Sequence, residues 1–123
     1  MPHAQRVLVV DDEPSNRILV ERALAAAGYL MTSAGDADEA MAAIRRSGPF
    51  DGYILDVMMP RVRGTELAVL IRRTQPDARI LFFSGYTGEL SARATAFQPN
   101  DTILAKPVSV GDLRQAVSRL LAP

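Results

Sequence analysis

The sequence predicts an open α/β fold: a doubly wound, five-stranded parallel sheet with five helices on its two faces. Short apolar runs alternate five times with amphipathic stretches along the 123 residues, which indicates five βα units. In the first run, 6–10, the four residues after Arg6 are continuously apolar, as expected of a strand buried on both faces of a parallel sheet. Five units are too few for a closed barrel of eight strands, so an open sheet is favoured.

Length and composition fit one globular domain spanning 1–123, with 48% apolar and 23% charged residues. The 14 basic and 14 acidic residues balance, which argues against a general nucleic-acid binder. The chain has no cysteine, which excludes disulfide scaffolds, Cys-ligated zinc and thiol nucleophiles. The apolar run before Asp11 has only four residues, 7–10, too few for a signal peptide or membrane span. We therefore expect a cytoplasmic protein that does not bind membranes.

The first βα unit begins with the strand 6–10. Pro14 suits the first position of the following helix, because its missing N–H would have no partner there. Gly28 suits the C-terminal end of that helix. The residues that we expect to face the core recur at helical spacing: Ile18, Leu19, Ala23, Leu24 and Ala27.

The second unit begins with a less apolar strand, 29–33, which is predicted to lie at an edge of the sheet. Asp36 and Glu39 have the spacing of a capping box and are predicted to open a helix. The pair 48–49, Gly followed by Pro, is predicted to end it.

The third strand, 53–55, ends at Asp56, and a loop leads to a helix that opens near Gly64. Arg72 and Arg73 lie near the predicted end of this helix. We expect both to be solvated and to complement the negative end of the helix dipole.

The last two units are shorter. The fourth strand is predicted over 79–83, its loop over 84–88 and a brief helix over 90–97. The fifth strand is predicted over 102–104 and is followed by a final helix. The core-facing residues expected in that helix are Leu113, Ala116, Val117, Leu120 and Leu121.

Polar residues gather where four of these strands end, and this edge is where open α/β sheets bind ligands. They are Asp11, Asp12, Glu13, Asp56, Ser84 and Lys106. Clustered carboxylates repel one another unless a cation neutralises them, and oxygen ligands without His or Cys suit Mg²⁺. A lysine and a hydroxyl opposite the metal could hold phosphoryl oxygens, and Asp56 could be the nucleophile. The constellation predicts a phosphoryl site built on an aspartate.

Each of these residues alone also has an ordinary structural explanation. Asp11 and Asp12 precede a helix and could be capping residues. Asp56 could be a solvated loop acid, Ser84 part of a turn, and Lys106 a surface charge. All of them follow predicted buried strands at the same edge of the sheet, and this joint placement favours the functional interpretation.

Four sequence motifs together are specific for one family: 7–14, 56–60 followed by Gly64, 84–85 and 106–107. With them the chain resembles, over essentially its whole length, the receiver domain of response regulators in bacterial two-component signalling. The short fourth helix makes it most similar to receivers of hybrid sensor histidine kinases. The resemblance implies a flavodoxin-like sheet with strand order 2-1-3-4-5.

The resemblance implies that Asp56 accepts a phosphoryl group from a phosphohistidine of a sensor kinase or phosphotransfer protein. It further implies a Mg²⁺ site. Asp12 would ligate the ion directly and Asp11 mainly through water, while Asp56 and the backbone carbonyl of Met58 would complete the protein ligands.

The same resemblance indicates which groups would hold the phosphoryl oxygens. Ser84 would hydrogen-bond one of them and Lys106 would pair with another, with backbone N–H groups near Met58 and Gly85 holding the rest. The peptide bond 106–107 is expected to be cis. Beyond this transfer to itself and its reversal by hydrolysis, no enzyme activity is implied.

Movement of Ser84 toward the phosphoryl group would pull the loop 84–88 and switch a protein-interaction surface. Many members of the family have Tyr or Phe three residues before the lysine, and this chain has Ile103 there. Coupling through an aromatic rotamer is therefore not expected. A downstream protein target and a monomer, or a dimer formed on phosphorylation, are expected, without direct binding of nucleic acid.

Two alternatives remain at this stage. One is a pseudo-receiver that binds partners without being phosphorylated. The other is a small Mg²⁺-dependent phosphatase with an aspartyl nucleophile, but such enzymes have a second Asp two residues after the nucleophile, where this chain has Met58. We expect Met58 and Met59 to fill space beneath the site loop.

Overall fold

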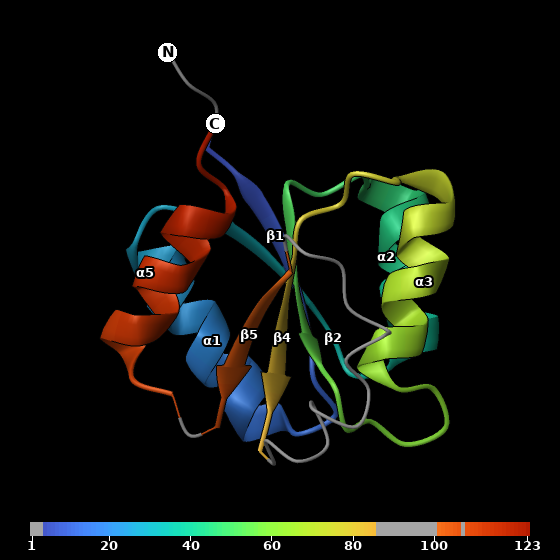
Figure 1. Ribbon diagram of the computed structural model, residues 1–123, viewed down its shortest axis with the longest axis horizontal. Helices are drawn as coiled ribbons and strands as arrows, with labels where there is room; N and C mark the ends of the chain where they lie inside the picture. Colours follow the sequence, from blue (N-terminus) through green and yellow to red (C-terminus); the bar gives the residue numbers. More distant parts are fainter. Residues whose placement is uncertain (1–3, 86–100, 107) are drawn as a thin grey trace.

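The computed structural model describes residues 4–85, 101–106 and 108–123. Five parallel strands form one sheet in the order β2-β1-β3-β4-β5, as Figure 1 shows. The strands are β1 (Arg6–Val10), β2 (Leu30–Ala34), β3 (Gly52–Asp56), β4 (Ile80–Ser84) and β5 (Thr102–Ala105). The predicted fold class and strand order are confirmed.

Helices cover both faces of the sheet. They are α1 (Pro14–Ala26), α2 (Ala37–Ser47), α3 (Gly64–Thr74) and α5 (Val110–Leu120). The helices α1 and α5 lie on one face, and α2 and α3 on the other (Figure 1). The helix predicted over 90–97 and the peptide bond 106–107 lie outside the described residues. Among the described helices, none has the length and apolar character needed to span a bilayer.

The central strands explain the continuous apolar runs of the sequence. Successive side chains of a strand point to opposite faces, and here each face is covered by helices. Leu8 and Val10 of β1 therefore join the core beneath α2 and α3, whereas Val7 and Val9 join the core beneath α1 and α5. All five residues of β3 are buried as well. The edge at which these strands end is thus held by strands that are fixed on both faces.

The edge strand and the helix termini follow the sequence predictions. In β2, which pairs with β1 alone, the one buried residue is Ala34. Asp36 caps α2 by accepting the N–H of Glu39 at 2.8 Å. Pro14 opens α1, and Gly28 follows its end with a φ of 102°, a backbone conformation that glycine adopts without strain.

The predicted core-facing side of α1 is partly wrong. Ile18 and Leu19 are 46% and 48% exposed, and Ala27 is also exposed. The buried residues of α1 are Val20, Ala23 and Leu24. The apolar stripe of this helix is wider than the surface that packs on the sheet, so spacing alone could not show which part of it is covered.

The prediction for Arg72 is also wrong, whereas Arg73 is exposed as expected. Arg72 is 11% exposed and forms a two-pronged ion pair with Asp101, at 2.5 and 3.2 Å. It also donates to the carbonyl of Ala78 at 2.9 Å. Asp101 lies just before β5, so the pair fastens the start of that strand to α3. The end of α3 is therefore fixed by a tertiary contact as well as by the helix dipole.

Candidate functional site

The register of the sheet brings the predicted site residues to one edge. Val10 pairs with Leu55, which places Asp11, the next residue, beside Asp56 at the end of β3. On the other side of β3, β4 ends at the buried Ser84, which pairs with Ala105. Residues far apart in sequence thereby become neighbours through backbone pairing alone.

Three carboxylates form the centre of this edge and are called the acidic triad here: Asp11, Asp12 and Asp56. One oxygen from each lies within 4.8 Å of the others. Asp11 and Asp56 are 2% and 4% exposed, whereas Asp12 is exposed to solvent. Their mutual repulsion and their hard oxygen donors, with no sulfur or imidazole, fit a divalent cation such as Mg²⁺.

Lys106 compensates part of this negative charge. Its Nζ lies 3.3 Å from Oδ2 of Asp11 and 3.4 Å from Oδ1 of Asp56. Its backbone N–H donates to the carbonyl of Ser84 at 2.7 Å, which extends the pairing of β4 and β5 by one residue. The ammonium is therefore held between the two buried carboxylates by the sheet itself.

The pKa of Asp56 is raised from 3.8 to about 6. Burial of the carboxylate is the main cause, and Lys106 acts in the opposite direction. The charge of Asp11 raises the pKa further, whereas a hydrogen bond from the N–H of Met58, at 3.2 Å, lowers it. Without a bound cation, Asp56 thus ionises less readily in the folded protein than it does in water.

Glu13 does not belong to the acidic triad, although the sequence places it beside Asp12. Its carboxylate accepts hydrogen bonds from Ser15 Oγ at 2.9 Å and Asn16 Nδ2 at 3.3 Å, at the start of α1. Its backbone N–H donates to Oδ1 of Asp11 at 2.9 Å. Glu13 therefore supports Asp11 and organises the first turn of α1.

The two methionines of the site loop differ. Met59 is 5% exposed and fills the core beneath the loop, as predicted. Met58 is 44% exposed, which contradicts that prediction, and its Sδ accepts a hydrogen bond from Arg63 Nη1 at 3.0 Å. Met58 lies at the mouth of the site because its backbone N–H is turned inward to Asp56.

The remaining predicted residues lie around this centre. Gly85 is exposed, and a Cβ there would lie 4.0 Å from Cβ of Lys106. Gly85, Lys106, Met58 and two triad members, Asp12 and Asp56, line an open cavity of about 500 Å³. This cavity gives solvent access to the carboxylate of Asp56. Ile103, in the middle of β5, is 40% exposed.

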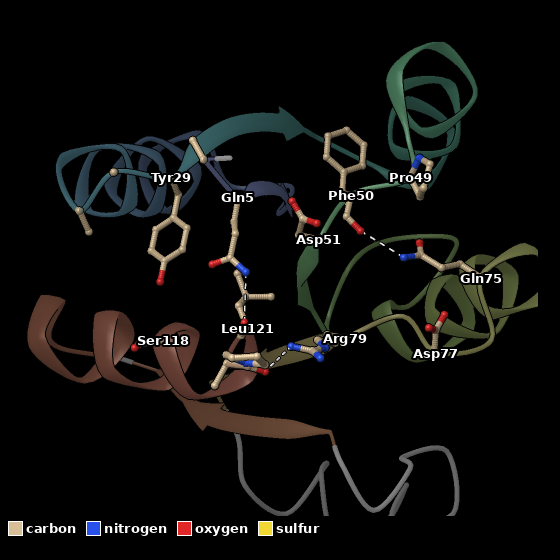
Figure 2. Close-up of a pocket in the computed structure, with 15 residues that line it drawn as sticks. Gln5, Tyr29, Pro49, Phe50, Asp51, Gln75, Asp77, Arg79, Ser118 and Leu121 are labelled. Carbon is tan, nitrogen blue, oxygen red and sulfur yellow. Dashed lines mark hydrogen bonds between the residues drawn. The ribbon is translucent and has the colours of Figure 1, made fainter. Parts of the chain in front are cut away.

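A second cavity, of about 1030 Å³, lies at the opposite edge of the sheet, where the strands begin (Figure 2). Several of its polar side chains bond to the protein's own backbone. Gln5 donates to the carbonyl of Leu121 and Gln75 to that of Phe50, each at 3.1 Å. It contains no member of the acidic triad, so its greater size does not make it the functional site.

Gly64, at the start of α3, has a spatial role that the sequence did not reveal. A Cβ at this position would lie 2.2 Å from the backbone oxygen of Asp56. Its N–H also donates to the carbonyl of Val57 at 3.1 Å. The helix can approach the end of β3 this closely because residue 64 has no side chain.

Gly64→Ala is therefore expected to push α3 away from the end of β3 and to displace Asp56. Overpacking of this kind costs about 1–3 kcal/mol of stability. We expect a lower urea midpoint and weaker Mg²⁺ binding, measured by circular dichroism and by calorimetry. Gly111→Ala is the control, since nothing lies within 4 Å of a Cβ there. Equal effects of the two substitutions would contradict this role of Gly64.

A family model described as the Response regulator receiver domain matches residues 7–118. The chain belongs to this family. Membership confirms the resemblance inferred from the motifs, and the flavodoxin-like receiver fold agrees with the observed strand order. The chain is thus a receiver domain of the kind found in two-component systems.

Relatives of this receiver come from several kinds of signalling protein. Sensor kinase CckA of Brucella abortus is 34% identical over 94% of this chain, which corresponds to 12% of the kinase. Other relatives are named as response regulators or transcriptional regulatory proteins. The chain spans half or less of the length of these curated relatives.

Solved receiver structures are closely similar. Chemotaxis protein CheY4 of Vibrio cholerae matches with a TM-score of 0.87 and 29% identity, over 97% of this chain and all of that one. Response regulator TrrA of Thermotoga maritima, solved in complex with Mg(2+)-BeF, matches with a TM-score of 0.83 and 33% identity, over 95% and 99%.

Proposed function

We propose that this receiver accepts a phosphoryl group on Asp56 from a histidine kinase or phosphotransfer protein, in a Mg²⁺-dependent reaction that switches a protein-interaction surface. One observation carries the proposal. A buried carboxylate, accessible through a cavity, is held between an ammonium and two further carboxylates. Such a cluster of buried charges destabilises the fold. Its presence therefore points to a site for a ligand that carries both positive and negative charge.

The proposed transfer is a displacement at phosphorus. An oxygen of Asp56 forms a bond to phosphorus while the bond from phosphorus to the donor's imidazole nitrogen breaks. The nitrogen keeps the electron pair of that bond and takes up a proton from water, which leaves a neutral imidazole. Lys106, now 3.4 Å from Asp56, would pair with an incoming phosphoryl oxygen. Ser84 and the N–H groups near Met58 and Gly85 would hold the others.

Asp11, Asp12 and Asp56, together with the carbonyl of Met58, would hold Mg²⁺. When bound, the ion offsets the repulsion between the carboxylates and the phosphoryl oxygens. The triad fits this ion because one oxygen of each carboxylate already lies within 4.8 Å of the others. The complex of the similar receiver TrrA with Mg(2+)-BeF supports the assignment.

The switch in this proposal couples Ser84 to β5. Phosphorylation adds about −1.5 to −2 charges beside Ser84, which would move toward the new oxygens. Ile103 has no hydroxyl or ring to follow that movement, so it would respond by repacking its exposed side chain. The proposal further takes 1–123 as one receiver unit, cytoplasmic, monomeric or dimerising on phosphorylation, with a protein rather than a nucleic acid as its target.

Intact mass measures the central step. The full chain is incubated with Mg²⁺ and a small phosphodonor, and we expect a mass increase of one phosphoryl group. Asp56→Asn should show no increase, and EDTA should prevent it in the unaltered chain. If the chain gains no phosphoryl group and also shows no response to beryllofluoride, the proposal is refuted and a pseudo-receiver is favoured. Rapid phosphate release from many substrates would favour a phosphatase instead.

Asp12→Ala separates metal binding from folding. We expect it to weaken Mg²⁺ binding by at least about tenfold, the lower end of what losing even an outer-shell group costs. The metal-free melting temperature should stay equal or rise, because one of three repelling charges is gone. Calorimetric Mg²⁺ titration and thermal melts with EDTA give the two quantities. A large fall in the metal-free melting temperature would contradict the repulsion on which the site is built.

A further inference from the structure

Arg17, in α1, contacts the backbone at the edge of the sheet that carries the acidic triad. Its side chain extends from the first turns of α1, and Nη1 donates to the backbone carbonyl of Asp11 at 2.8 Å. Its path passes over Gly35, since a Cβ at Gly35 would lie 3.2 Å from the same nitrogen. A glycine after β2 thus leaves room for the guanidinium.

The other polar groups of Asp11 are also engaged. Its N–H donates to the carbonyl of Ala34 at 3.1 Å. Oδ1 accepts the N–H of Glu13 at 2.9 Å, and Oδ2 pairs with Lys106 at 3.3 Å. Arg17 completes this set at the carbonyl, so Asp11 is held at backbone and side chain alike.

The carbonyl that Arg17 holds belongs to the peptide group that joins Asp11 to Asp12. Because a peptide group is planar, fixing its oxygen fixes the plane and with it the direction in which Asp12 leaves the backbone. Within the described part of the chain, the carboxylate of Asp12 makes no hydrogen bond or ion pair of its own. Its orientation toward the triad therefore depends on the backbone.

We propose that Arg17 is a positioning residue for the cation site: by holding the peptide plane between Asp11 and Asp12, it orients the carboxylate of Asp12 for Mg²⁺. The inference rests on the proposed function only in that the acidic triad binds Mg²⁺.

The sign of the effect distinguishes positioning from simple charge. Arg17 is positive and contacts the backbone of Asp11, itself a proposed ligand, so by Coulomb repulsion alone its removal would tighten the binding of a cation. Loss of positioning weakens binding instead. A neutral substitution that weakens Mg²⁺ binding thus reports on geometry.

The experiment compares Mg²⁺ dissociation constants of the full chain by calorimetry, well below the melting temperature of each variant. We expect Arg17→Met to raise the constant about threefold to tenfold, up to the lower end of outer-shell effects in metal sites. Arg17→Lys, which keeps a charged donor, should stay within about twofold of the unaltered chain. Arg22→Met, an exposed arginine of the same helix, is the matched control and should change nothing.

An unchanged or lower constant in Arg17→Met would overturn the inference. If Arg17→Met does not fold, Arg17→Gln takes its place, since its neutral side chain is too short to reach the carbonyl. If the unaltered chain is phosphorylated but Arg17→Met has an unchanged Mg²⁺ dissociation constant, the proposed function stands and the role of Arg17 does not. Absence of any Mg²⁺ binding by the unaltered chain would overturn both.

Discussion

Asp56→Asn is expected to raise the melting temperature of the metal-free protein at pH 8 by roughly 6–12 °C, although it removes the proposed phosphoacceptor. The reason is the cost of a buried charge. The pKa of Asp56 is raised from 3.8 to about 6, and each unit corresponds to about 1.4 kcal/mol. The ionised carboxylate therefore destabilises the native state by about 2–3 kcal/mol, and asparagine does not carry that charge.

The gain should depend on pH in a defined direction. Below pH 3.8 Asp56 is protonated in both the native and the unfolded state, so the substitution gains nothing. Between 3.8 and about 6 the native state binds more protons than the unfolded state, and the stability of the unaltered protein falls as pH rises. Above about pH 6, the full difference in stability between Asp56→Asn and the unaltered protein is present.

Thermal melts in EDTA from pH 3.5 to pH 8 measure this difference. Asp77→Asn, at an exposed site, is the control and should leave the melting temperature nearly unchanged. Adding Mg²⁺ should narrow the gap between Asp56→Asn and the unaltered chain, because the cation offsets the charge that the substitution removes. A gap that is absent at pH 8, or equally large at pH 3.5, would contradict the buried-charge explanation.

Arg72→Met should be the most destabilising of these changes, at about 3–5 kcal/mol. The side chain of Asp101 is 1% exposed, so removing Arg72 takes away the guanidinium that faces this buried carboxylate at 2.5 and 3.2 Å. The carbonyl of Ala78 loses a donor at the same time. The urea midpoint should fall accordingly, whereas Arg73→Met, one residue further along the same helix, should have little effect.

Replacing both partners tests the same explanation. Two apolar residues in place of a buried ion pair often cost little, because neither leaves a charge behind. Arg72→Met combined with Asp101→Leu should therefore recover much of the stability that Arg72→Met loses. If the double variant is less stable than Arg72→Met alone, the loss comes from packing rather than from the buried carboxylate that has lost its arginine.

Much of the fold was predictable because its signals are local. The continuous apolar run of β1 indicates burial on both faces, and Asp36, Pro14 and Gly28 mark helix ends through their own backbone chemistry. The edge that carries the acidic triad followed from a general property of parallel sheets, and the strand order from the resemblance to receivers.

The remainder depends on contacts between distant segments. Nothing near Arg72 in the sequence points to Asp101, 29 positions away, and that contact decides that the arginine is buried. The need for glycine at Gly64 comes from the oxygen of Asp56, which only the folded chain places there. The sequence did not point to Arg17 for the same reason. Its partner is a backbone carbonyl, a group that every residue has, so the residue type at position 11 does not indicate the contact.

The contact between Lys106 and Asp11 joins positions 95 residues apart, near the two ends of the chain. The two residues follow the first and the last strand of the chain, so the other three strands all lie between them in the sequence. The site therefore exists only once the sheet is complete from β1 to β5. On the proposed function, a chain that lacks β5 would lack the ammonium that faces Asp56, so phosphorylation of Asp56 would report that the whole sheet has formed.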